Sequence, residues 1–282
     1  MSERLLLCSD LDRTLLPNGL QPESPQARPL LRSLAVRSEL ILAYVSGRHL
    51  ALIEQAIAEY GLPRPQFAVG DVGTSIYRSV GGEWRLWDQW SQHIATDWAG
   101  HPAGDLARLF ADIEIIALQE PEKQNRFKLS YYADPTHDHA VLLADMHRRL
   151  RDRGVRASLV WSVDETTPVG LLDVLPASAT KLGAVRFLMA ELGIGETRTL
   201  FAGDSGNDLP VLTSGIPAVL VANATPEVRG AAESAAQAAG HADRLYVARG
   251  GFLGMNGNYA AGVLEGLAHF HPQWADRLAT VR

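Results

Sequence analysis

The segment Leu5–Leu15, LLLCSDLDRTL, opens with the unbroken apolar run that is typical of a buried parallel strand. Two carboxylates, Asp10 and Asp12, follow where that strand is expected to end. An unpaired buried charge is strongly destabilising, and the carboxyl ends of strands in an open parallel sheet are where ligands bind. The two acids therefore need a cation, a reaction or both, and the segment predicts a metal-assisted carboxylate site. Taken alone, the alternative of two solvated acids in a turn stays open.

The composition is that of an ordinary globular protein. The chain has 282 residues, of which 46% are apolar and 21% charged, enough for one large domain or two modest ones. A net charge of -6 argues against a nucleic-acid or anionic-membrane partner, and no apolar run reaches the roughly 18–20 residues that span a membrane. Cys8 is the only cysteine, which excludes an intramolecular disulfide and favours a cytoplasmic location.

Strand and helix patterns alternate at both ends of the chain and predict a doubly wound, mostly parallel α/β sheet. After the opening strand we expect a helix at about 26–36, a strand at 40–45, a helix at 49–60, a strand at 67–70 and a hairpin strand at 74–77. The alternation returns with strands at 171–175, 199–202, 218–221 and 246–247, and with helices at 180–192, from Asp208, from Pro226 and at 259–269.

The middle of the chain has a different pattern. Five of the six tryptophans lie between Glu83 and Gly170, where strand-like segments at 126–133 and 157–163 flank a helical pattern at 138–153. We therefore expect a core domain made of residues 1–82 and 171–282, interrupted by an inserted α+β cap domain of residues 83–170. Most of the tryptophans are expected in the core of this small domain.

Two further segments suit a phosphate. Ser46-Gly47-Arg48 follows a buried strand and precedes a helix, so its backbone N–H groups and hydroxyl can cradle an anion. The alternative is an ordinary helix N-cap at Ser46. Lys181 lies in the first turn of an amphipathic helix, where the helix dipole disfavours a cation unless an anion is bound; the alternative is a solvated surface lysine.

A last segment suits a metal. Gly203–Asp208, GDSGND, follows a buried strand and carries three carboxylate or amide side chains in a flexible loop, which are ligands suited to Mg²⁺. The order of these parts, a carboxylate pair, a hydroxyl-bearing loop, a lysine and an acidic loop, resembles the haloacid dehalogenase superfamily of phosphatases. The resemblance implies that Asp10 is the nucleophile and Asp12 the general acid/base. It also implies that Ser46, Gly47 and Lys181 hold the phosphoryl group with Asn207 in support, and that Asp10, the carbonyl of Asp12, Asp204 and Asp208 form the Mg²⁺ site.

Three further stretches narrow the family. Val72–Tyr77, Phe127–Tyr132 and the late Gly257–Tyr259 with Gly262–Gly266 are similar to the sucrose-phosphate phosphatase family. The cap placement is similar to that of the sugar-phosphatase branch, which implies sugar recognition by the cap. Lys128, Ser130 and Tyr132 share one face of the expected cap strand, although this face can also be merely solvated. The implied substrate contacts are Arg48, Gly73, Thr74, Lys128, Ser130 and Tyr132.

Some positions depart from the family pattern: Arg13 stands where Asn is usual, Ser46 where Thr is common and Ser75 where Glu is usual. We expect a Mg²⁺-dependent phosphatase that acts through an aspartyl-phosphate on a phosphorylated disaccharide. Sucrose 6-phosphate is the leading candidate, with mannosylfructose phosphate or another glycosyl phosphate as alternatives. A phosphosugar mutase or phosphotransferase, and a sugar-phosphate sensor without activity, are the rivals. A sucrose-phosphate synthase is the expected protein partner.

Overall fold

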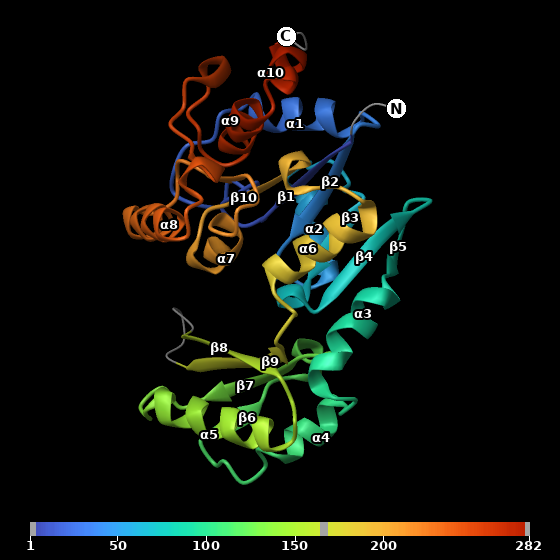
Figure 1. The fold of residues 1–282 in the computed structure, drawn as a ribbon, viewed down its shortest axis with the longest axis vertical. Coiled ribbons are helices and arrows are strands. Elements are labelled where there is room, and N and C mark those ends of the chain that lie inside the picture. Colours follow the sequence, from blue (N-terminus) through green and yellow to red (C-terminus); the bar gives the residue numbers. More distant parts are fainter. Residues whose placement is uncertain (1–3, 164–168, 280–282) are drawn as a thin grey trace. The chain divides into compact units, whose positions relative to one another are not determined.

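Two sheets organise the chain, which a computed structural model describes over residues 4–163 and 169–279 (Figure 1). The first unit comprises the described residues up to Leu86 and from Lys181 onward. The second comprises the described residues of Trp87–Thr180. None of the helices in the described part is long and apolar enough to cross a bilayer.

The first unit is built on an eight-stranded sheet in the order β12-β11-β10-β1-β2-β3-β4-β5. The strands from β12 to β3 pair in parallel, and β4 and β5 add an antiparallel hairpin. The prediction of a mostly parallel α/β core is confirmed. The strands are β1 (Leu5–Ser9), β2 (Leu40–Val45), β3 (Phe67–Gly70), β4 (Ser75–Val80), β5 (Glu83–Leu86), β10 (Thr199–Gly203), β11 (Ala218–Leu220) and β12 (Leu245–Val247).

The central strands carry the core of this unit. Every residue of β1, β2 and β10 is buried, as expected where helices cover both faces of a parallel sheet. Leu7 of β1 lies between Leu42 and Leu200 of its two neighbours. The helices are α1 (Ala27–Ala35), α2 (Leu50–Glu59), α6 (Lys181–Leu192), α7 (Leu209–Leu212), α8 (Pro226–Ala238), α9 (Ala260–Phe270) and α10 (Pro272–Ala279).

The Gly262–Gly266 stretch has a packing role in α9. The two glycines are four residues apart and share one face of the helix. A Cβ on Gly266 would lie 2.4 Å from Cβ of Val219, and one on Gly262 would lie 3.0 Å from Cγ1 of Val221. Glycine is therefore needed here because α9 packs closely on β11 and the residue after it.

The second unit is built on a four-stranded antiparallel sheet in the order β6-β7-β9-β8. Trp90 and Trp98 are fully buried, and Trp98 meets the ring of Phe127 edge-on at 5.8 Å, so these tryptophans belong to its core as predicted. The strands are β6 (Ile116–Leu118), β7 (Leu129–Ala133), β8 (Ala157–Val163) and β9 (Gly170–Pro176), and the helices are α3 (Asp88–Ala95), α4 (Ala103–Arg108) and α5 (His139–Asp152).

The boundaries between the units differ from those expected. Gly81 and Gly82, just before the expected start of the insertion at residue 83, are the two central residues of the β4–β5 hairpin and both have positive φ. Residues 83–86 therefore belong to the first sheet. The apolar segment 171–175, expected in the core sheet, lies in β9 and pairs with β7 and β8. An apolar run of this length fits a central strand of either sheet, so its pattern did not distinguish them.

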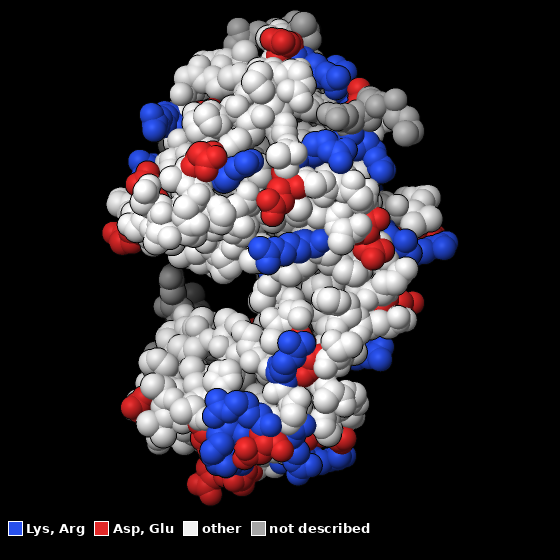
Figure 2. All heavy atoms as spheres, viewed as in Figure 1, with Lys and Arg blue, Asp and Glu red and all other residues white. Residues whose placement is uncertain are grey.

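Charged side chains of both signs are interspersed on the face shown in Figure 2. No broad area of one sign gathers there among the described residues.

Candidate active site

Three buried aspartates meet at the carboxyl end of the first sheet. Asp10 follows β1, and its N–H donates to the carbonyl of Ala202 in the adjacent strand β10 at 2.9 Å. Asp204 follows β10 directly, and Asp208 follows one turn later. Ligand oxygens of Asp10, Asp204 and Asp208 lie within 4.8 Å of one another. The alternative of solvated turn acids is therefore wrong for Asp10, whose residue is 5% exposed.

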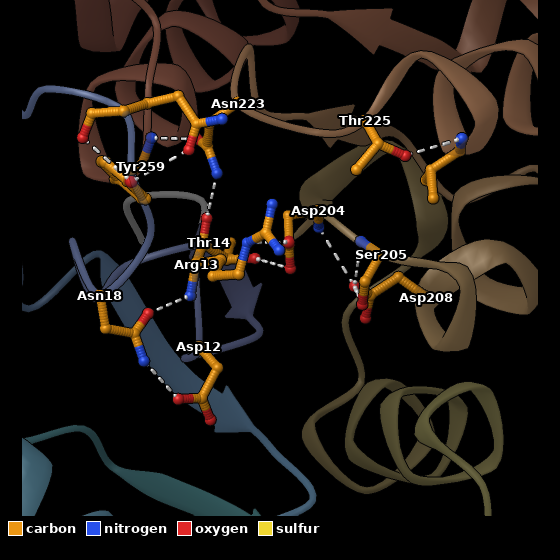
Figure 3. Close-up of polar contacts among 12 residues, drawn as sticks. Asp12, Arg13, Thr14, Asn18, Asp204, Ser205, Asp208, Asn223, Thr225 and Tyr259 are labelled. Carbon is orange, nitrogen blue, oxygen red and sulfur yellow. Dashed lines mark hydrogen bonds and ion pairs between the residues drawn. The ribbon is translucent and has the colours of Figure 1, made fainter. Parts of the chain in front are cut away.

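The loop after β10 is held by Asp208. One of its carboxylate oxygens accepts the backbone N–H groups of Asp204 at 3.1 Å and Ser205 at 3.2 Å, as Figure 3 shows. This arrangement forms a capping box at the short 3-10 helix Gly206–Asp208. A Cβ on Gly203 would lie 2.5 Å from Cγ of Asp208, so only glycine fits at this position.

Lys181, the first residue of α6, connects this loop to Asp10. Its Nζ lies 3.0 Å from Oδ1 of Asp10 and 2.7 Å from Oδ1 of Asp208, and it donates to Oδ1 of Asn207 at 2.8 Å. The side chain is 10% exposed. Burial lowers the pKa of Lys181, but the two carboxylates outweigh it and raise the pKa overall. The surface-lysine alternative is wrong, and Asn207 lies where it can orient the ammonium.

The acidic cluster has more negative than positive charge. Burial raises the pKa of Asp10 to about 7 despite the contact with Lys181, and burial together with Asp208 raises the pKa of Asp204 to about 6. Asp204 accepts a hydrogen bond from Oγ1 of Thr14 at 3.2 Å and lies 3.5 Å from Nε of Arg13. Carboxylate oxygens with uncompensated charge are the donors that Mg²⁺ prefers, so the residues present fit a divalent cation.

Asp12 has a different environment from this cluster. Arg48 contacts both of its carboxylate oxygens, with Nε 2.8 Å from Oδ2 and Nη2 2.6 Å from Oδ1. Asn18 donates to Oδ1 from Nδ2 at 2.8 Å. Burial raises the pKa of Asp12, but the bonds from Arg48 and Asn18 outweigh it and hold that pKa below its ordinary value. The Asp12 carboxyl is therefore kept ionised.

The loop after β2 follows the sequence expectation in part. Ser46 is buried, its N–H donates to the carbonyl of Val69 at 2.9 Å, and its Oγ accepts the N–H of Arg48 at 3.2 Å. The N-cap of α2 is His49, so the alternative that Ser46 is the N-cap is wrong. Gly47 is exposed, and a Cβ there would meet nothing within 4 Å. The loop therefore lies at the same edge of the sheet as Asp10, and the backbone of Gly47 is exposed there.

The expected sugar contacts lie in both units. Gly73 ends the 3-10 helix Asp71–Gly73, and the hydroxyl of buried Thr74 donates to the carbonyl of Asp71 at 2.9 Å. In the second unit, Ser130 is buried and its hydroxyl donates to Asp173, whereas the hydroxyl of Tyr132 contacts Glu120 at 3.0 Å. Lys128 is half-buried just before β7. A role of these residues in sugar binding stays a prediction.

Two features of the site were missed in the sequence. Arg48 was expected to contact sugar, and here it is the partner of Asp12, 36 residues away in the chain. Asn18 was not singled out at all, because it lies in a turn-rich segment whose side-chain partners depend on how the loop folds back. Nothing in the local pattern marks either contact.

The chain is similar to phosphatases over almost all of its length. The family model for sucrose-6F-phosphate phosphohydrolase matches residues 3–271. A protein of Nitrosococcus oceani, described only as a HAD-like hydrolase, is 58% identical over 273 residues, which cover 97% of this chain and 73% of that one. The mannosylfructose-phosphate phosphatase of Agrobacterium fabrum is 30% identical over 271 residues, covering 94% of this chain and 96% of the relative.

A solved structure agrees with these relatives. The sucrose-phosphatase of Synechocystis sp. PCC6803, determined with sucrose and phosphate, aligns with a TM-score of 0.71 and 27% identity over 95% of this chain and 98% of that one. The fold of this solved structure, the matched family and the acidic site of the present chain all indicate a phosphatase. The chain therefore belongs to the sucrose-6F-phosphate phosphohydrolase family and is a phosphoric monoester hydrolase of the HAD-like fold.

Proposed function

We propose that the protein is a Mg²⁺-dependent phosphatase that hydrolyses a phosphorylated disaccharide, with sucrose 6-phosphate as the first candidate, through an aspartyl-phosphate intermediate. The observation that carries this proposal is the buried cluster in which Lys181 contacts both Asp10 and Asp208, beside Asp204. Such a cluster supports the proposal, because a carboxylate held next to a fixed positive charge is what phosphoryl transfer needs most.

In the first half-reaction, a carboxylate oxygen of Asp10 attacks phosphorus and forms the aspartyl-phosphate. The bond from phosphorus to the sugar oxygen breaks, its electron pair stays on that oxygen, and the oxygen takes a proton from Asp12. Ser46, Gly47 and Lys181 hold the phosphoryl oxygens, and Asn207 orients the Lys181 ammonium. Mg²⁺ would be held by Asp10, Asp204 and the carbonyl of Asp12 with Asp208 in support, and when bound it neutralises charge on the phosphoryl group.

In the second half-reaction, Asp12 accepts a proton from water as the water oxygen attacks phosphorus. The bond between phosphorus and the Asp10 oxygen breaks, which releases inorganic phosphate and restores the Asp10 carboxylate. The pair with Arg48 keeps Asp12 ionised, and this state suits the acceptance of a proton. Donation to the sugar oxygen in the first half-reaction requires Asp12 to be protonated and its contact with Arg48 to loosen.

Two relatives bear on which sugar the substrate carries. The solved relative holds sucrose and phosphate, and another relative is a mannosylfructose-phosphate phosphatase, so both phosphorylated disaccharides are candidates. We assign sugar contacts to Arg48, Gly73 and Thr74 in the first unit and to Lys128, Ser130 and Tyr132 in the second. Arg13 and Ser75, where the family usually has Asn and Glu, are the positions at which specificity can differ from that of the relatives.

The test is phosphate release from sucrose 6-phosphate, mannosylfructose phosphate and a hexose phosphate, with Mg²⁺ and with a chelator, using Asp10→Asn as the blank. We expect phosphate to be released from a disaccharide phosphate when Mg²⁺ is present and not when the chelator is present. Preference for mannosylfructose phosphate would change the assigned sugar, and absence of release from every sugar phosphate would contradict the proposal. Phosphorylation of an added sugar acceptor would instead favour a mutase or phosphotransferase. The sucrose-phosphate synthase partner and the cytoplasmic location stay predictions.

A further inference from the structure

The loop between β1 and α1 contains a side chain that the proposed chemistry does not use. Asn18 donates from Nδ2 to Oδ1 of Asp12 at 2.8 Å, and its own Oδ1 accepts the backbone N–H of Arg13 at 2.8 Å (Figure 3). Arg13 has a φ of 56°, in the left-handed region that residues other than glycine rarely adopt. One amide therefore connects the Asp12 carboxylate to a strained point of the loop backbone.

The same loop is held at its far side by the late Gly257–Tyr259 stretch and its neighbour Asn256. The hydroxyl of Tyr259 donates to the carbonyl of Gln21 at 3.1 Å. The amides of Asn256 and Asn258 both donate to the carbonyl of Pro22, at 2.8 and 3.0 Å. These three bonds join residues that are more than 230 positions apart in the chain.

A buried asparagine completes the support. Asn223 donates from Nδ2 to the carbonyl of Arg13 at 2.7 Å, and its Oδ1 accepts the N–H of Tyr259 at 2.8 Å. Tyr259 is fully buried and has a φ of 52°. A Cβ on Gly19 would lie 2.7 Å from the Tyr259 hydroxyl oxygen, so the loop packs closely against it. Both ends of the segment 13–22 are therefore attached to the same C-terminal support, and Asn18 lies between them.

We propose that Asn18 is a positioning residue for Asp12 and that Asn223 and the 256–259 segment hold the loop that carries it. An amide does not ionise, so Asn18 can donate to Oδ1 whether Asp12 is charged or protonated. Oδ2 accepts from Nε of Arg48 at 2.8 Å, so in the acid form of Asp12 the proton is carried on Oδ2 once that contact has loosened, while Oδ1 keeps its bond from Asn18. This inference rests on the acid role proposed for Asp12.

The experiment compares kcat/KM for the sugar phosphate with kcat/KM for p-nitrophenyl phosphate. This parameter reports the steps up to the first irreversible one, departure of the alcohol, and nitrophenolate departs without a proton. We expect Asn18→Ala to lower kcat/KM about tenfold on the sugar phosphate and less than about twofold on p-nitrophenyl phosphate. The tenfold loss is part of the rate enhancement of about 10²–10⁴-fold that a general acid supplies. Leu20→Ala, in the same loop and fully exposed, is the matched control and leaves the ratio unchanged.

Two further variants separate the possible failures. Tyr259→Phe removes the hydrogen bond to Gln21 and leaves the contacts of Asn18 in place. We expect it to lower kcat/KM for the sugar phosphate more than for p-nitrophenyl phosphate, but by less than Asn18→Ala does. Equal losses on both substrates for Asn18→Ala and Tyr259→Phe would show a purely structural loop and overturn the inference. Asp12→Asn must show the largest selective loss; if it affects both substrates equally, the acid role of Asp12 in the proposed function fails, independently of Asn18.

Discussion

Lys181 and Asp208 form a buried ion pair, with Nζ 2.7 Å from Oδ1, and the same ammonium lies 3.0 Å from Asp10. Removing one partner of a buried pair leaves the other charge without compensation and costs about 3–5 kcal/mol. We expect Lys181→Met to lower the midpoint of urea unfolding strongly at neutral pH and to abolish phosphate release. Lys123→Met removes an exposed lysine and is the control, with a change within about 0.5 kcal/mol. Equal midpoints for the two variants would contradict the buried pair.

The raised pKa values of Asp10, about 7, and Asp204, about 6, predict how pH and metal act on stability. A group whose pKa is raised by folding stabilises the protein below its unfolded pKa, and this contribution is lost as pH rises through the folded pKa. The metal-free protein should therefore lose stability from these groups between about pH 4 and 7. In the proposed function Mg²⁺ is held by the deprotonated carboxylates, so we expect the stabilisation by Mg²⁺ to increase as pH rises.

The measurement is Tm at pH 5, 6, 7 and 8, with and without Mg²⁺. The gain from Mg²⁺ should be small at pH 5 and largest at pH 8. Asp204→Asn should reduce the gain at every pH. A gain that is as large at pH 5 as at pH 8 would show that these carboxylates do not bind the ion.

The position of Asp10 predicts that Asp10→Asn abolishes turnover while the fold is kept. Asparagine has nearly the same shape and lacks the carboxylate that is proposed to attack phosphorus, and Lys181 retains its contacts with Asn207 and Asp208. Phosphate release measures the first effect, and circular dichroism with Tm the second. Retained release from a folded variant would refute the role of Asp10 as nucleophile.

Two glycines in helices give a matched pair for the packing of α9. Gly266→Ala places a Cβ 2.4 Å from Val219, and overpacking of this kind costs about 1–3 kcal/mol. Gly230→Ala in α8 meets nothing within 4 Å and should stabilise by about 0.5–1 kcal/mol, because alanine is the better helix former. Opposite shifts in the urea midpoint are expected. Shifts of the same sign would mean that α9 does not pack on β11 as closely as described.

Much of the fold follows from the order of apolar segments. The runs that form β1, β2 and β10 are continuous and buried, which a parallel sheet with covered faces requires. Sheet membership was less predictable. The run at 171–175 fits either sheet, and Gly81-Gly82 is equally compatible with a domain boundary and with the hairpin turn that it forms.

The sequence by itself placed Asp10 and Asp204 directly after buried strands, at the ends where an open parallel sheet binds ligands. The structure shows that β1 and β10 are neighbours, so the two carboxylates lie close together at one edge of the sheet. Only the tertiary structure decided which charges pair. Lys181 is a buried partner of Asp10 and Asp208, Arg48 contacts Asp12, and Asn18 supports it from a loop attached to Tyr259. The succession of strands and helices along the chain is encoded in local apolar patterns, whereas a side-chain contact depends on how distant loops pack against each other, which no local pattern records.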